Sequence, residues 1–215
     1  MEEIIIRRYK KIDRPFVREI AWDTAFIGKP ADVFFEDKDI LMDFLTQYFT
    51  DYEPQSCFIA ESNNLVMGYL IGAKGVSLLK DIFQFKIFPK LLIKVIKRGT
   101  LFRKKNIIFI FNCFLSFLRR EFQMPDFNTA YPAILHINIR ANFRNLNAGS
   151  RLIAAYLNYL SQEKIPGVHL ATMSDEAGEF FRKQGFIPLH KGKRSYFRYI
   201  LQKDLPLYIY GKKLQ

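Results

Sequence analysis

The chain has 215 residues, 49% of them hydrophobic and 25% charged, which excludes a disordered chain and suffices for the core of one domain. Its net charge of +12 indicates affinity for anions and leaves open a phosphate-bearing cofactor, an acidic substrate, nucleic acid or an anionic membrane. No signal-peptide pattern precedes the first strand, and Cys57 and Cys113 lie among apolar residues, so we expect a cytoplasmic protein with free thiols. The three His and two Cys lack the spacing of metal ligands, so we expect no metal.

Residues 1–73 predict one strand, two helices and a β-hairpin. Apolar residues recur at helical spacing in both helices, and Pro54 ends the second. The turn Ser62-Asn63-Asn64 joins the two strands of the hairpin. The predicted elements are a strand over 4–9, helices beginning at Arg14 and at about Lys38, and strands over 57–60 and 65–71.

A basic and apolar segment follows, from about residue 74 to residue 128. Helical spacing over 78–88 is interrupted by Pro89 and Gly99. The apolar run 106–118 is too short to span a bilayer as a helix, which needs about 20 residues, so we expect a buried helix. Its apolar side chains are expected to pack on one another or on the rest of the domain.

The stretch 134–160 organises the chain. Residues 134–139 predict a strand that places Ile137 and Ile139 on one face and His136 and Asn138 on the other. A polar turn leads into an amphipathic helix whose first turn contains Gly149, which lets another group approach its backbone. The unpaired N–H groups and dipole of a helix N-terminus attract anions, so this turn predicts a pyrophosphate site.

The C-terminal part predicts a strand over 167–172 and a helix that starts near Asp175 and ends at Gly185. Residues 186–189 and 196–201 are expected to pair as a terminal hairpin. Residues 205–215 form an apolar, then basic tail, which we expect to pack on the domain or on a second subunit.

The motif Arg144-Asn145-Leu146-Asn147-Ala148-Gly149 is similar to the acyl-CoA motif of the GNAT superfamily of N-acetyltransferases, (Gln/Arg)-x-x-Gly-x-(Gly/Ala). Asn147 replaces the first Gly, and Asn tolerates positive φ well. Residues 177–186 resemble the later helix of the family, which ends in Gly-Phe. Residues 131–137 and 166–170 also resemble acetyltransferase-like domains related to those beside O-GlcNAc hydrolases.

The resemblance implies an α/β fold: a mixed, mostly antiparallel central sheet flanked by helices. It implies one domain over 1–215, with a helical insertion at about 74–128 between the third and fourth strands. We expect this insertion to cap the acceptor side of the cleft; a structural embellishment or a homodimer interface is the alternative. The implied activity moves an acetyl group from acetyl-CoA, the co-substrate, to a small-molecule or peptide amine by direct transfer in a ternary complex.

In the family the fourth and fifth strands splay apart and the CoA arm lies between them. By resemblance, the backbone of Ile137 and Ile139 would bind that arm, and Arg144–Ser150 would hold the pyrophosphate. Ser174 stands where the family often has an Asn near the arm, and Phe181 where it often has the Tyr that protonates the thiolate. The implied CoA-binding residues are Ile137, Ile139, Arg144, Asn145, Leu146, Asn147, Ala148, Gly149, Ser150, Ser174 and Phe181.

Catalysis stays open at the sequence level, because Phe181 has no proton to give. Another donor acts, or water does, or the protein is slow or inactive. His136, Tyr131 and Ser174 are the acid–base candidates, but we interpret His136 as a structural, hydrogen-bonded residue because it faces away from Ile137 and Ile139. The alternative is a CoA-binding module without turnover, or a protein peripheral to an anionic membrane; no nucleic-acid motif is present.

Overall fold

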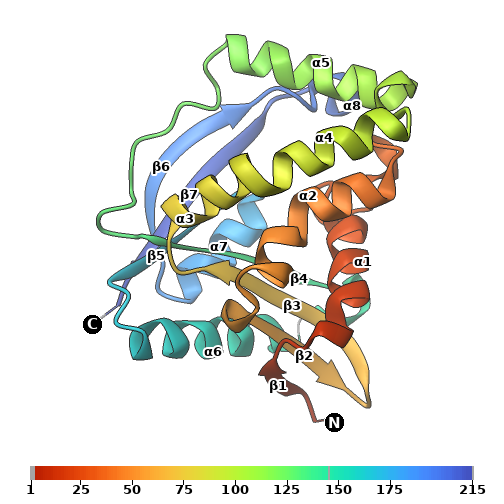
Figure 1. The fold of residues 1–215 in the computed structure, drawn as a ribbon. Coiled ribbons are helices and arrows are strands. Elements are labelled where there is room, and N and C mark those ends of the chain that lie inside the picture. The colour runs from red at the N-terminus through yellow and green to blue at the C-terminus, as the bar shows by residue number, and fades with distance from the viewer. Residues whose placement is uncertain (1–2, 145, 215) are drawn as a thin grey trace.

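The computed structural model describes residues 3–144 and 146–214. Its centre is a seven-stranded sheet in the order β1-β2-β3-β4-β5-β7-β6 (Figure 1). Only β4 and β5 run parallel, and every other neighbouring pair is antiparallel. The strands are β1 Ile5–Arg8, β2 Cys57–Ser62, β3 Leu65–Ala73, β4 Ala133–Ile139, β5 Gly167–Thr172, β6 Ile187–Arg194 and β7 Leu205–Lys213.

Helices cover both faces of this sheet, and three more α-helices lie between β3 and β4 in the chain. The flanking helices are α1 Arg14–Thr24, α2 Lys38–Asp51, α6 Ala148–Gln162, α7 Asp175–Lys183 and the short α8 Arg198–Leu201. The helices between β3 and β4 are α3 Val76–Ile82, a π-helical turn Phe83–Ile87, α4 Phe88–Lys97 and α5 Lys104–Leu118. The mixed, mostly antiparallel sheet flanked by helices confirms the predicted fold class.

Two apolar clusters, one on each face, hold the layers together. On one face α1 and α2 pack on side chains such as Ile59, Tyr69 and Ile71. On the other face α6 and α7 pack on alternate residues of the same strands, such as Leu70 and Leu135. This division follows from the alternation of side chains along a strand.

The turn between β2 and β3 lies where the sequence predicted it. Asn63 and Asn64 have φ values of 49° and 61°. Positive φ at both central residues is the mark of a type I′ turn, whose twist matches that of the flanking strands. The predicted turn is therefore confirmed.

The predicted terminal hairpin is wrong. β6 runs on to Arg194 and pairs with β7, and the supposed second strand, 196–201, is a turn followed by α8. Phe197 packs edge-on against Phe26, with ring centroids 5.0 Å apart, so this apolar run fills a core instead of forming a strand. The expected tail is β7 itself, inserted between β5 and β6.

Residues 106–118 form the predicted helix, but the prediction that its apolar side chains are buried is wrong. The segment is helical, but the stripe of apolar side chains on α5 faces solvent, and its two buried residues are the polar Asn106 and Ser116. Pro89 does not break the helix as expected: α3, the π-helical turn and α4 follow one another without interruption, and Pro89 lies directly after the π-helical turn. Gly99 does end α4, with φ of 63°.

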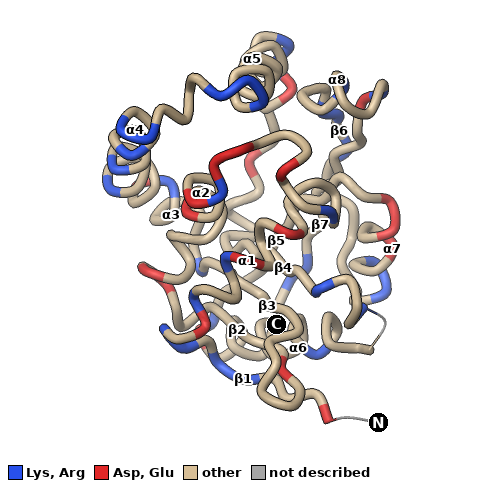
Figure 2. The backbone as a smooth tube through the Cα atoms, turned by 90° about the vertical axis from the view of Figure 1, so that its right-hand side faces the viewer, with Lys and Arg blue, Asp and Glu red and all other residues tan. Residues whose placement is uncertain are grey.

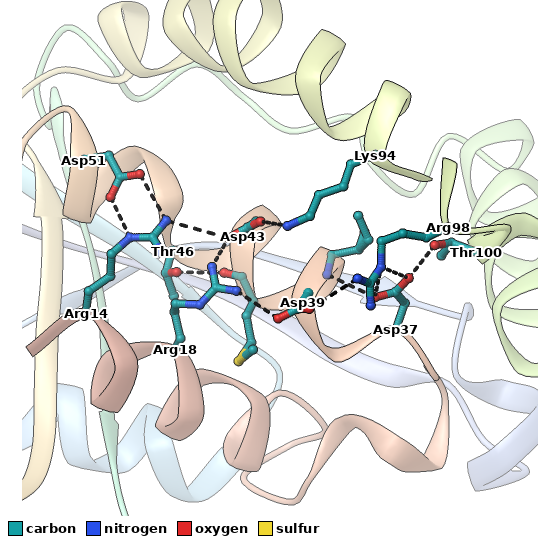
Figure 3. Close-up of polar contacts among 12 residues, drawn as sticks. Arg14, Arg18, Asp37, Asp39, Asp43, Thr46, Asp51, Lys94, Arg98 and Thr100 are labelled. Carbon is teal, nitrogen blue, oxygen red and sulfur yellow. Dashed lines mark hydrogen bonds and ion pairs between the residues drawn. The ribbon is translucent and has the colours of Figure 1, made fainter. Parts of the chain in front are cut away.

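An ion-pair network fastens α4 to α2 (Figure 3). Lys94 Nζ lies 2.7 Å from an Asp43 carboxylate oxygen, and Arg98 Nε lies 3.0 Å from Asp37. Burial opposes ionisation of Asp37, but hydrogen bonds from Arg98 and Thr100 outweigh it and hold the pKa of Asp37 below its ordinary value. Asp43 also pairs with Arg18 of α1, so three helices share one charged cluster.

Candidate functional site

β4 and β5 part soon after they meet. Their parallel pairing covers only Ala133 with Val168 and Ile134 with His169. Beyond these pairs β4 continues to Ile139 and β5 to Thr172 without pairing to each other, while each keeps its other neighbour, β3 or β7. The carboxyl halves of two adjacent strands therefore leave their facing backbone groups open.

The orientation of these open groups follows from the pairing of β4 with β3. The Arg140 N–H donates to the Met67 carbonyl at 2.9 Å. Alternation along an antiparallel pair then turns the N–H and C=O groups of Ile139 and Ile137 to the other side, toward β5. These are the two residues whose backbone was expected to bind an extended ligand.

The turn after β4 ends at the N-terminus of α6, which lies at the same edge of the sheet. Asn147 is the N-cap residue and adopts the left-handed conformation, with φ of 58°, as its tolerance of positive φ predicts. The first helical hydrogen bond runs from Arg151 N–H to the Asn147 carbonyl at 3.1 Å. The N–H groups of residues 148–150 have no hydrogen-bond partner among the described residues, so they are free to bind an anion.

Long-range contacts hold this turn in place. An Arg144 side-chain N–H donates to the Gly28 carbonyl at 3.1 Å, which ties the turn to the segment between α1 and α2. Arg140 pairs with Glu19 of α1 at 2.9 Å. On the other side, Gln184 donates to the Ser150 hydroxyl at 3.0 Å. Neither Gln184 nor Gly28 carried a local signal in the sequence, because the partner of each lies more than 30 residues away.

Solved structures share this fold over nearly the whole chain. SsHAT matches with a TM-score of 0.72 at 19% identity, covering 98% of each chain. A Drosophila melanogaster polyamine N-acetyltransferase matches with a TM-score of 0.59 at 10% identity, over 99% of this chain and all of the other. The chain has the fold of the GNAT N-acetyltransferases. No family model matches the sequence, and no curated protein sequence matches it.

One further solved structure has the same fold. yncA from Salmonella typhimurium, solved with its cofactor acetyl-CoA, matches with a TM-score of 0.57 at 11% identity, over 99% of this chain and 94% of its own. At these identities the likeness concerns the fold. What the GNAT fold does in this chain has to be argued from the residues that it brings together.

His136 lies where β4 and β5 part, two residues after the last paired position. As predicted, it is on the face opposite to Ile137, toward α2, and its ring centroid lies 5.5 Å from that of Phe49. The expected hydrogen bond is missing: no described residue donates to or accepts from its ring. The side chain is exposed to solvent, yet desolvation by the neighbouring protein atoms, with a smaller effect of His169, lowers the pKa of His136 below its ordinary value.

The two phenylalanines of α7 have different positions. Phe181 is 5% exposed and packs in the core, with its ring 5.8 Å from that of Phe186 and 6.4 Å from that of Tyr210. Phe180 approaches the first turn of α6 instead, because a Cβ on Gly149 would lie 3.1 Å from its ring. Gly149 thus has a packing role toward Phe180. The sequence motif contained both residues, but only the packing of α7 distinguishes them.

The other expected site residues are spread along the structure. Ser174 is the N-cap of α7 and accepts a hydrogen bond from the Ala177 N–H at 3.3 Å, at the open end of β5. Tyr131 is buried before the start of β4, and its carbonyl lies 2.7 Å from Nδ1 of His169, at the paired end of β4 and β5. Leu146 is exposed in the turn and Ala148 is buried in the first turn of α6; Asn145 lies outside the described residues.

Proposed function

We propose that this protein is an acetyl-CoA-dependent N-acetyltransferase that transfers an acetyl group directly to an amine in a ternary complex. One observation carries the proposal. The unpaired edge of β4, with the backbone of Ile137 and Ile139 turned toward β5, leads straight to the open N-terminus of α6. An extended thioester with a pyrophosphate at one end requires this order of groups. Matching structures of N-acetyltransferases, one with acetyl-CoA, support the same reading.

Residues of this chain would bind and orient the co-substrate, which supplies the activated acetyl group. The N–H groups of residues 148–150 would hold the pyrophosphate, aided by Arg144 and Arg151. The backbone of Ile137 and Ile139 would bind the arm as an additional strand. In the transfer, the amine nitrogen attacks the acetyl carbon, the carbon–sulfur bond breaks, and the thiolate takes a proton as the new amide loses one.

His136 is the candidate that would remove the proton from the amine. It lies where the strands part, and its lowered pKa favours the neutral imidazole, the form that can accept a proton. His136→Gln is expected to lower kcat about 10²–10⁴-fold with little change in the KM for acetyl-CoA. His190→Gln, on the half-exposed part of β6, is the matched control. Equal rates for wild type and His136→Gln would remove His136 from catalysis.

A donor for the leaving thiolate is not provided by α7, since position 181 is a buried phenylalanine and position 180 is a phenylalanine as well. Water is the proton source in our proposal. The second candidate function, CoA binding without turnover, is favoured by this same observation. Phe181→Tyr would place a hydroxyl in the core, so we expect a lower free energy of unfolding and no increase in the rate of acetyl transfer. An increase of about tenfold in that rate would instead place position 181 beside the thiolate.

We also propose that α5 covers the acceptor side of the site. Phe109, on the inner side of α5, packs on Phe34 and Phe197 with ring centroids 4.7 Å and 5.7 Å apart. Phe34 belongs to the segment between α1 and α2, whose Gly28 holds Arg144. Phe197 follows Tyr196, whose hydroxyl contacts Met173 directly after β5. The inner side of α5 therefore touches segments next to both open strand ends.

Two measurements on purified protein test the activity. Calorimetric titration with acetyl-CoA reports binding, and a panel of small-molecule and peptide amines is screened for release of the CoA thiol. Binding with amine-dependent thiol release is expected. Binding without release with any amine would favour the non-catalytic alternative, and no binding would refute both.

A further inference from the structure

α4 and α5 turn apolar side chains to solvent in a regular pattern. On α5 the exposed residues recur at helical spacing and form one stripe: Ile107, Ile110, Phe111, Phe114, Phe117 and Leu118. On α4 the exposed residues are Phe88, Leu92, Ile93 and Ile96. These ten side chains are 42% to 64% exposed, and Phe102, between the two helices, is 86% exposed. A soluble surface rarely carries so many large apolar side chains without a partner.

This exposure is not a sign of loosely held helices. The inner side of α5 is fixed by Phe109 in an aromatic cluster and by Asn106, which accepts from the Glu36 N–H at 2.8 Å and donates to the Thr100 carbonyl at 2.9 Å. α4 is held by the buried Leu91 and by its ion pairs to α2. Both helices are therefore anchored with their apolar sides outward.

The charge of the same segment is one-sided. Residues 74–120 contain twelve Lys and Arg against one acidic residue, Asp81. Figure 2 shows Lys and Arg on α4 and on the segment that leads into α5, at the periphery of the molecule. Some of these cations are engaged, such as Lys94 and Arg98 with α2. Within residues 86–120, five exposed cations have no ion-pair or hydrogen-bond partner for their side chains among the described residues: Lys86, Lys90, Lys97, Lys104 and Arg120.

We propose that the outer face of α4 and α5 docks on the surface of an anionic lipid bilayer. Apolar side chains would enter the boundary between headgroups and acyl chains, while the free cations contact the anionic headgroups. A second copy of this chain fits less well, because two faces that each carry these five cations would repel each other. No helix among residues 3–144 and 146–214 has the length and apolar character to cross a bilayer.

The test is sedimentation of the full chain with vesicles of phosphatidylcholine containing 0–50% phosphatidylglycerol, at low and high salt. Binding should increase with the anionic fraction and weaken with salt. Two variants carry five Lys or Arg to Ser changes, so their net charges are equal. One changes the five free cations above; the control changes Lys10, Lys11, Lys164, Lys183 and Lys203, which are exposed elsewhere. We expect about a hundredfold weaker binding for the first variant only.

A second pair of variants tests the apolar stripe. Phe111, Phe114 and Phe117 changed to Ser should weaken binding about a hundredfold, whereas Ile12, Leu65 and Ile187 changed to Ser should not. All six side chains are exposed, and unchanged thermal unfolding would confirm that each variant folds. The proposal is overturned if the protein does not bind vesicles with 50% anionic lipid at low salt. It is also overturned if, in either pair, the variant and its control lose the same vesicle affinity. A wild-type dimer that dissociates only in the Phe variant would show that the apolar stripe binds a second copy of the chain instead.

Discussion

α5 and α6 are both amphipathic helices of 15 residues, yet they bury opposite sides. α6 places Leu152, Ile153, Tyr156 and Leu160 against the sheet, and each is at most 1% exposed. α5 places Asn106 and Ser116 inside and leaves a stripe of Phe and Ile in solvent. The same helical period thus specifies a helix in both cases, but it does not specify which side meets the core.

The difference lies in what the two helices meet. α6 lies on a sheet face that alternates apolar residues toward it, so its apolar stripe is buried. α5 meets the segments 31–37 and 195–197, which present polar groups to it: the Glu36 N–H to Asn106 and the Ser195 hydroxyl to Ser116. Buried polar groups without a partner cost about 1–3 kcal/mol each, so Asn106 and Ser116 fit that surface better than a Leu would.

The largest expected contrast is in core truncation. Leu152→Ala in α6 should lower the free energy of unfolding by about 2–5 kcal/mol, because it leaves a cavity in a closely packed core. Phe114→Ala in α5 removes a 54% exposed side chain and should change it by about 0.5 kcal/mol or less. Urea denaturation measures both. A loss above 2 kcal/mol for Phe114→Ala would mean that the outer stripe is buried in the free protein.

The polar side of α5 gives the next effect. Asn106→Ala leaves the Glu36 N–H and the Thr100 carbonyl without their partner and should destabilise the protein by about 2 kcal/mol. Asn158→Ala is the matched control, since Asn158 is exposed on α6, and it should be nearly neutral. Urea denaturation measures both variants. An equal change in the free energy of unfolding for the two variants would contradict the finding that α5 buries its polar side.

The N-terminus of α6 can be tested through its backbone conformation. Asn147→Val places a β-branched residue at φ of 58° and should weaken acetyl-CoA binding about tenfold, because the strained turn moves the N–H groups of the first turn. Asn147→Gly should bind as the wild type does. Position 149 is less suitable for this test, because any side chain there would press on Phe180. Full affinity of a folded Asn147→Val variant would place the pyrophosphate elsewhere.

The smallest effect concerns the attachment of α4 to α2. The pKa of Asp37 is lowered in the folded state, so its contribution is present above the unfolded value of about 4 and is lost as the pH falls through the folded value. Asp37→Asn, which keeps an N-cap residue, should therefore be less stable than wild type at pH 6, and this difference should vanish in acid. Asp32→Asn is the exposed control. A stability difference that does not shrink at all as the pH falls below the unfolded value would argue against the ion pair.

Local chemistry let the sequence determine the helices and most strands, the turn at Asn63 and Asn64, and the left-handed Asn147. These features depend on backbone torsion and on hydrophobic period, which nearby residues set. The turn before α6 is local in the same sense, and its assignment as a pyrophosphate site stays a prediction. Strand alternation also fixes the direction of the backbone groups of Ile137 and Ile139, while their role toward CoA stays a prediction.

Only the tertiary structure decided which groups meet across long separations. β7 pairs between β5 and β6, so the supposed tail became an inner strand and the apolar run after Arg194 became part of a core. Phe181 packs in the core, whereas Phe180 packs against Gly149 in the first turn of α6, although the two residues are adjacent in sequence. The outward turn of α5 has the same cause: the burial of a side chain depends on the surface opposite to it, and residues far away in the chain supply that surface.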